Sequence, residues 1–192
     1  MENINENRKL WSVQRITAAA LLTAVGILIP MVMPIKILIE PASFTLASHV
    51  AIFIAMMLSP AIAAAVAVGT TIGFLVSAPL VIALRAASHL VFATVGGFYL
   101  QKHPETLSSP IKVHVFSFLI AVLHSVCEVA VVCAFYFGGG MSAAYYESGL
   151  LKGVILLLGV GGVVHSLVDF EIALVIHKAL SGQRGFAALA RR

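Results

Sequence analysis

Long apolar stretches, interrupted by short polar segments, dominate the chain. Between residues 16 and 35, and again between 41 and 84, there is no Asp, Glu, Lys or Arg. A helix needs about 20 apolar residues to cross the hydrocarbon core of a bilayer. The second stretch is long enough for two such helices. Ser59-Pro60 is the natural break between them, because the residue before a proline disfavours helical geometry.

Similar breaks divide the rest of the chain. Pro79 ends the third predicted helix, a polar loop from Lys102 to Pro110 follows the fourth, and three glycines from Gly138 end the fifth. We therefore predict an all-α integral membrane bundle of six transmembrane helices, with residues 1–192 forming a single membrane domain. The predicted helices cover about residues 14–34, 44–59, 61–78, 81–101, 112–137 and 150–178.

Composition supports a membrane protein. Of the 192 residues, 60% are apolar and 10% are charged, and the mean hydropathy is +1.05, whereas soluble domains carry about 25% charged residues. The polar start lacks the short apolar core and cleavage site of a signal peptide, so the first helix is expected to remain in the mature protein. The net charge of +4 indicates basic membrane flanks rather than nucleic-acid binding.

The basic residues predict the orientation of the bundle. Six helices place both termini on one side, which then carries nine of the twelve basic residues. The other side carries only Lys36, Arg85 and Lys152. Because cytoplasmic segments carry the excess of Lys and Arg, we predict cytoplasmic termini. The segments 36–44, 79–85 and 138–152 are then external.

Ionisable residues within apolar helices cost free energy to bury and are therefore candidates for function. The pair Ser48-His49 recurs forty residues later as Ser88-His89. Two further histidines each precede an acidic residue by four positions, which places both side chains of a pair on one helix face. These pairs are His124 with Glu128 and His165 with Asp169.

The polar residues closest to the outer surface are expected to line a substrate pocket. The predicted substrate-binding residues are Arg85, His49, His89, Glu128, Ser48, Ser88, Lys36 and His124, with Glu40, Tyr145 and Tyr146 in the roof. Arg85 matters most, because its planar guanidinium matches the geometry of a carboxylate. Asp169 is expected to lie too deep to touch a ligand. No catalytic residue, cofactor or metal ion is expected.

Each of these residues also has a structural interpretation. Arg85 can extend to the membrane interface, His49 and His89 can be packing residues, and the two His–acid pairs can be polar links between helices. Phe44, Phe53, Phe74 and Phe92 are interpreted as lipid-facing or core residues. Two other functions stay open: an intramembrane metal-dependent enzyme that uses the His–acid pairs as ligands, and a solitary proton-coupled carrier.

The sequence resembles the substrate-binding S components of energy-coupling factor vitamin transporters. The resemblance rests on the length, the six predicted helices, and Ala20 and Ala24 on one face of the first helix. It also rests on the runs ASFTLASH at 42–49 and LRAASH at 84–89, which are similar to the pantothenate- and niacin-type members. This family implies a location in the bacterial plasma membrane and a protein without ATPase activity of its own.

The resemblance also implies partners and a ligand. An S component captures a vitamin from outside and docks on a membrane scaffold (T) subunit that two cytoplasmic ATPase subunits drive; the docking motif falls on Ala20 and Ala24. Together with the positive pocket, this predicts import of a carboxylate-bearing vitamin. Pantothenate is preferred, because the serines and histidines offer more hydrogen bonds than niacin uses and the only tryptophan, Trp11, lies on the cytoplasmic side. A niacin-specific S component is the alternative.

Overall fold

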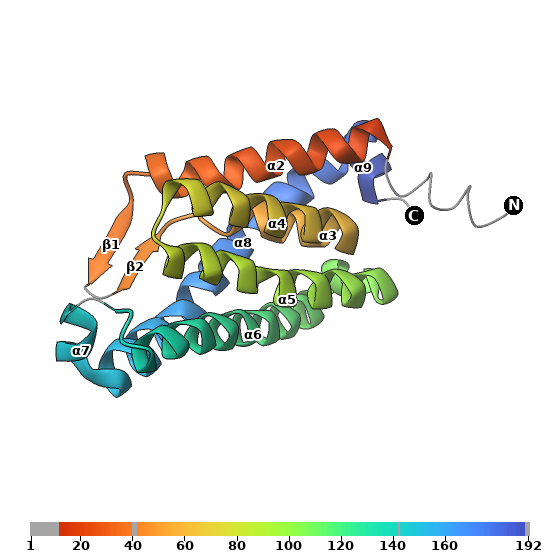
Figure 1. Cartoon of the computed structure of the whole chain (residues 1–192). Coiled ribbons are helices and arrows are strands. Elements are labelled where there is room, and N and C mark those ends of the chain that lie inside the picture. Colours follow the sequence, from red (N-terminus) through yellow and green to blue (C-terminus); the bar gives the residue numbers. More distant parts are fainter. Residues whose placement is uncertain (1–11, 40–41, 142, 191–192) are drawn as a thin grey trace, which may run out of the picture.

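The computed structural model describes residues 12–39, 42–141 and 143–190, which form a bundle of long helices (Figure 1). Within these residues, five helical stretches are long and apolar enough to cross a membrane. They are α2 (Val13–Val32), α4 (Pro60–Ser77), α5 (Leu80–Lys102), α6 (Pro110–Phe137) and the stretch Tyr146–Ser181. The prediction of an all-α membrane bundle is thereby confirmed for the described part of the chain.

The last of these stretches is not a single regular helix. It starts within α7 (Ala143–Gly149), continues through a π-helical segment, η2 (Leu150–Val160), and ends with α8 (Gly161–Ser181). A short helix, α9 (Arg184–Ala190), follows, and a 3-10 turn, η1 (Pro104–Ser108), connects α5 to α6. Proline occupies the first position of both α4 and α6, where its missing N–H costs no hydrogen bond.

The segment between α2 and α4 corrects the predicted helix over 44–59. Strands β1 (Lys36–Ile39) and β2 (Ala42–Thr45) form an antiparallel hairpin, and a turn then leads into α3 (Val50–Leu58). Ala47 in this turn has a φ of 66°, which a helix does not allow. The nine residues of α3 rise only about 14 Å, too short to cross a ~30 Å core. The described residues therefore contain five helices of spanning length, not six.

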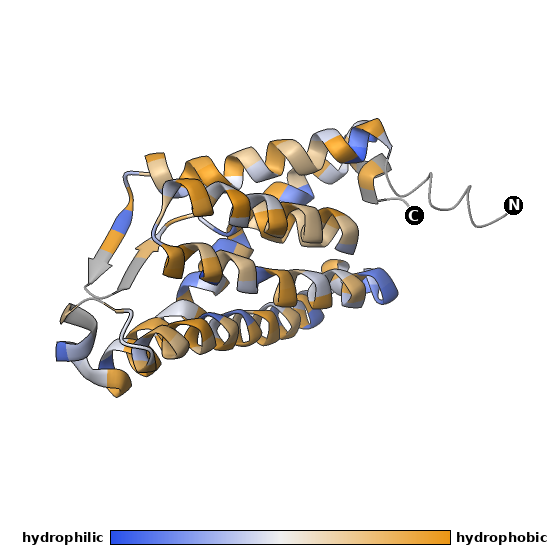
Figure 2. Cartoon of the chain, in the orientation of Figure 1, coloured by the Kyte–Doolittle hydropathy of each residue, from blue (hydrophilic) through white to orange (hydrophobic). Residues whose placement is uncertain are grey.

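The short helix α3 forms the centre of the protein. All nine of its residues are buried. Phe53 of α3 packs against Phe92 of α5 and Phe170 of α8, with ring centroids 5.6 and 5.3 Å apart, and all three side chains are fully buried. The long helices instead expose apolar side chains such as Val76 and Leu119, as expected for surfaces that face lipid. Figure 2 shows the apolar residues along the long helices.

Helices α2 and α4 approach closely through small residues. A Cβ added at Gly69 would lie 2.6 Å from the Thr23 side chain, and one at Gly73 would overlap Ile27. Ala20 and Ala24, in contrast, are exposed on α2. The small residues of α4 thus serve packing within the chain, whereas the predicted docking residues of α2 lie on the outer surface.

Candidate binding cavity

A cavity of about 360 Å³ lies between the hairpin and the long helices. Residues from α2, the hairpin, the following turn, α3, α4, α5, α6 and α8 contribute to its wall. Its polar lining consists of Lys36, Thr45, Ser48, His49, Thr70, Ser77, Arg85, His89, His124, Glu128 and His165. Polar side chains from distant parts of the sequence therefore meet in one hollow within an apolar bundle.

The turn before α3 presents Ser48 and His49 to the cavity. The buried carboxylate of Asp169 on α8 accepts hydrogen bonds from the backbone N–H groups of Ala47 (2.7 Å) and His49 (2.8 Å). Its Oδ2 also lies 3.1 Å from Nδ1 of His49. Asp169 does not line the cavity. Through these hydrogen bonds it fixes the position of Ser48 and His49, which do line it.

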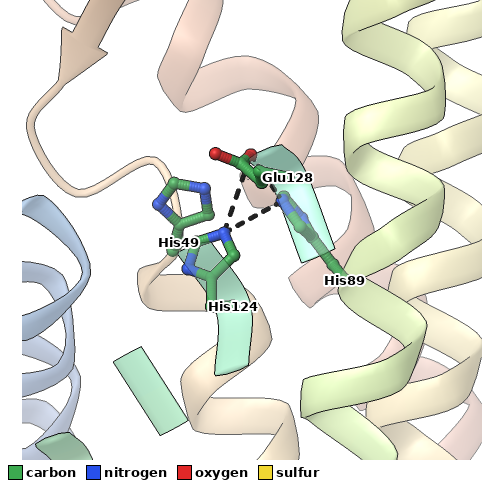
Figure 3. A group of neighbouring side chains, drawn as sticks. All are labelled: His49, His89, His124 and Glu128. Carbon is green, nitrogen blue, oxygen red and sulfur yellow. Dashed lines mark hydrogen bonds and ion pairs between the residues drawn. The ribbon is translucent and has the colours of Figure 1, made fainter. Parts of the chain in front are cut away.

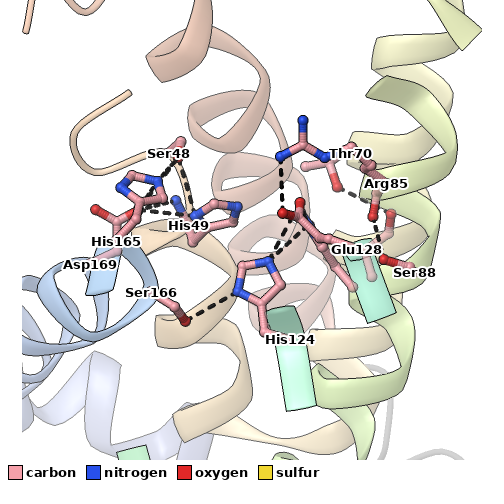
Figure 4. Close-up of polar contacts among 12 residues, drawn as sticks. Ser48, His49, Thr70, Arg85, Ser88, His124, Glu128, His165, Ser166 and Asp169 are labelled. Carbon is pink, nitrogen blue, oxygen red and sulfur yellow. Dashed lines mark hydrogen bonds and ion pairs between the residues drawn. The ribbon is translucent and has the colours of Figure 1, made fainter. Parts of the chain in front are cut away.

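Arg85 and Glu128 form an ion pair at the cavity wall (Figure 4). Nη2 of Arg85 donates to Oε2 of Glu128 at 2.9 Å, and both side chains are largely buried. Ser88 does not line the cavity, because its hydroxyl donates to the carbonyl of Arg85 one turn earlier on the same helix, at 2.7 Å. Arg85 therefore lies in the protein interior instead of extending to the membrane interface.

Four histidines line the same cavity as this ion pair. His89 and His124 contact the other oxygen of Glu128: their Nε2 atoms lie 3.1 and 3.6 Å from Oε1 and 3.2 Å from each other (Figure 3). The ring of His49 lies 4.5 Å from that of His124, centroid to centroid. His165, which the sequence-based site omitted, lies 3.0 Å from the hydroxyl of Ser48 through Nε2. Its signal in the sequence was the same spacing to an acid as His124 has to Glu128.

The structure thus brings seven of the eight predicted site residues to the cavity, and Ser88 is the exception. Lys36 lies there with its ammonium donating to the carbonyl of Pro30 at 2.8 Å. Tyr146, which was predicted to form part of the roof, does not line the cavity; its hydroxyl donates to the carbonyl of Tyr136 at 3.0 Å. Glu40 and the side chain of Tyr145 lie outside the described residues.

Two phenylalanines also line the cavity, which corrects their interpretation from the sequence. Phe44 on β2 and Phe74 on α4 had been interpreted as lipid-facing or core residues, but both contribute to the wall. The ring of Phe44 packs on Gly161, where a Cβ would lie 2.8 Å from the ring. The cavity therefore offers aromatic surfaces as well as cationic groups.

The chain is similar to a known transporter. Over 170 residues it is 46% identical to the niacin transporter NiaX of Lactococcus lactis subsp. cremoris (strain MG1363). The match covers 88% of this chain and 75% of the relative. No family model matches the chain, and no solved structure matches it.

Proposed function

Because the chain belongs to the family of substrate-binding S components of energy-coupling factor transporters, as does its 46% identical relative, we propose that it binds niacin for import. The protein is a multi-pass protein of the cell membrane. As an S component it is a binding subunit and not itself an enzyme. The intramembrane enzyme and the solitary carrier have no comparable support.

Niacin replaces pantothenate as the preferred ligand. The relative is a niacin transporter, and the cavity has the features that a small aromatic acid needs. Phe44 and Phe74 lie at the wall, and aromatic rings pair favourably with one another when offset or edge-on. The sequence offers two arguments against niacin: the surplus of hydrogen-bonding groups and the lack of an aromatic partner, since Trp11 is expected on the far side of the membrane. The second of these is the argument that the cavity wall bears on. These two phenylalanines remove that argument.

The observation that carries the proposal is that Arg85 lines the same cavity as these rings. A guanidinium carries five N–H donors in a planar fork, so Arg85 can bind Glu128 and a ligand carboxylate together. Lys36 adds a second positive charge to the same cavity. In a membrane interior such charges are attractive for an anion, because little water screens them. A neutral analogue with the same ring would gain much less binding free energy from these charges.

The proposed transport role includes an orientation and partners. The N-terminal end of α2 and the short C-terminal helix α9 lie at the same end of the bundle (Figure 1). We propose that the hairpin, turn and α3 together complete one further crossing, which gives six crossings with both termini cytoplasmic. The cavity then opens to the outside. The exposed Ala20 and Ala24 are proposed to dock on the scaffold subunit, which two ATPase subunits drive.

The first test compares three ligands on the purified protein by calorimetry. We expect niacin to bind more tightly than nicotinamide, which keeps the ring but lacks the carboxylate, and more tightly than pantothenate. A charge-assisted hydrogen bond contributes about 1.5–3 kcal/mol, so nicotinamide should bind roughly 10- to 150-fold more weakly. Equal affinity for niacin and nicotinamide, or tighter binding of pantothenate, would contradict the proposal.

Variants at Arg85 extend this test to the protein side. Arg85→Ala should weaken niacin by a similar factor and leave nicotinamide nearly unchanged, because only niacin carries the charge. Arg85→Lys keeps the charge but loses the planar fork of the guanidinium. Its affinity for niacin should lie between those of the wild type and Arg85→Ala. The matched control is Arg184→Ala, which removes an exposed arginine outside the cavity. A uniform loss for both ligands would indicate a damaged fold instead of a lost carboxylate contact.

A further inference from the structure

Glu128 Oε1, His89 Nε2 and His124 Nε2 form a compact group of atoms that are able to bind a metal ion. The three atoms lie 3.1, 3.2 and 3.6 Å from one another. Glu128 is a carboxylate here, because Arg85 binds its other oxygen at 2.9 Å, and a carboxylate only accepts hydrogen bonds. If both ring nitrogens carry hydrogen, two donors face each other. If only His124 Nε2 lacks hydrogen, it accepts from His89 Nε2–H and lies 3.6 Å from Oε1. Hydrogen bonds can therefore satisfy the group, and what points to an ion is the spacing of the three atoms.

A cation between the three atoms would replace these hydrogen bonds with metal–ligand bonds. Zinc binds imidazole nitrogen at about 2.0–2.1 Å and carboxylate oxygen at about 2.0–2.2 Å, so ligand atoms around a tetrahedral ion lie about 3.3–3.5 Å apart. The observed separations of 3.1–3.6 Å match that spacing. His49 offers a fourth nitrogen, since one ligand atom from each of the four residues lies within 4.8 Å of the others, a wider limit than the spacing in a tetrahedral site.

The surroundings of the histidines resemble the support that metal ligands usually have. A ligating histidine commonly binds a carboxylate, carbonyl or hydroxyl through its second ring nitrogen, which fixes the ring. Nδ1 of His124 lies 3.1 Å from the hydroxyl of Ser166, and Nδ1 of His49 lies 3.1 Å from Oδ2 of Asp169. Nε2 of His124 is then directed to the cluster. His124 and Glu128 are 2% and 5% exposed, so water competes little for these positions.

We propose that His49, His89, His124 and Glu128 hold a divalent transition-metal ion, with Zn²⁺ as the best match, at the wall of the cavity. Three imidazoles and one carboxylate favour zinc over calcium or magnesium, which prefer oxygen ligands. The second group, His49, His165 and Asp169, is a weaker candidate, because the Asp169 oxygens already accept two backbone N–H groups.

The ion would also act on the vitamin, and this part of the inference rests on the proposed function. With Arg85 next to the site, the bound ion adds positive charge to the cavity wall, and an anion nearby offsets their repulsion. Niacin and the ion should therefore strengthen each other's binding by the same factor, as linkage requires. The ion is a ligand of the protein in its own right, so its binding is measurable without niacin.

The experiment measures zinc on the full chain purified through a tag without histidines. After a chelator has removed bound metal and has itself been removed, titration with Zn²⁺ should show one tight site per chain. Elemental analysis of the titrated protein, freed of excess Zn²⁺, should then find one zinc ion per chain. Co²⁺ in its place should give the intense visible absorption of a tetrahedral site with nitrogen ligands. Retention of no zinc, together with no binding at micromolar Zn²⁺, would overturn the proposal.

Variants locate the ion and separate it from the vitamin. His124→Gln and Glu128→Gln should each remove the tight site, while His114→Ala, at an exposed histidine outside the cavity, should keep it. Two different ligand variants are used so that one unstable protein does not decide the result, and size-exclusion profiles check folding. An unchanged zinc titration in both folded variants would also overturn the proposal. Niacin titration of the chelated wild type then tests the proposed function separately.

Discussion

Asp169 controls the cavity without lining it. Its carboxylate accepts the backbone N–H groups of Ala47 and His49 across more than a hundred residues of sequence. The turn that it holds includes a left-handed alanine, with φ 66° at Ala47, a conformation that costs an L-residue roughly 1–2 kcal/mol. The position of Ser48 and His49 therefore depends on a residue that the sequence suggested was irrelevant to the ligand.

We predict that Asp169→Asn both destabilises the protein and weakens niacin binding. An amide directs its NH₂ group at one of the backbone donors, and an unsatisfied buried donor costs about 1–3 kcal/mol. The measurements are thermal unfolding in detergent and niacin calorimetry. Glu171→Gln, two residues further along α8 at an exposed ion pair with His114, is the control and should change neither. Normal affinity in a destabilised Asp169→Asn protein would show that the turn keeps its position without the carboxylate.

At the scale of elements, the contact between α2 and α4 depends on glycine. Gly69 and Gly73 lie against Thr23 and Ile27 with no room for a Cβ. Small residues allow this close approach, and membrane helices gain most of their association from such packing. The cavity lies beside this contact, because Gly26, Thr70 and Phe74 from the same two helices line it.

Gly69→Leu should therefore separate α2 from α4. Overpacking of this kind typically costs about 1–3 kcal/mol, and Thr23 is branched at Cβ and cannot easily rotate away. We expect a lower unfolding temperature in detergent and weaker niacin binding. Gly182→Leu is the matched control, since a Cβ there meets nothing within 4 Å. Equal unfolding temperatures for the two variants would argue against a tight α2–α4 contact in the membrane protein.

For the whole molecule, the proposed transport role depends on an outer surface that meets other subunits. Ala20 and Ala24 lie exposed on α2, whereas Gly26 of the same helix is buried and lines the cavity. A flat face of small residues suits close contact with another membrane helix. The binding cavity and the docking face are therefore separate parts of one helix.

We predict that Ala20→Trp and Ala24→Trp abolish uptake of niacin in cells that express the complete transporter, while the purified variants bind niacin normally. The bulky ring holds the scaffold subunit away but does not reach the cavity. Ala130→Trp, at an exposed alanine of α6, is the control and should transport normally. Uptake at the normal rate in both α2 variants would remove the docking assignment.

The sequence by itself determined the class of protein and most of the chemistry in the cavity. Helices of membrane proteins form from local apolar stretches, so composition and prolines located α2, α4, α5 and α6 closely. Buried ionisable residues are costly, so they stood out without an alignment. That cost identified Arg85, His49, His89, His124 and Glu128, all of which line the cavity.

Only the tertiary structure decided how these groups are combined. Two interactions limit α3 to nine residues. One is the pairing of Lys36–Ile39 with Ala42–Thr45 in the hairpin, and the other is the hydrogen bonding of the following turn to the Asp169 carboxylate. Both interactions compete with helix formation, and the second comes from a partner 120 residues away. The aromatic wall and the meeting of Glu128 with two histidine nitrogens depend likewise on helices packed side by side. Local sequence carries no information about such distances, because they arise only when the whole bundle has formed.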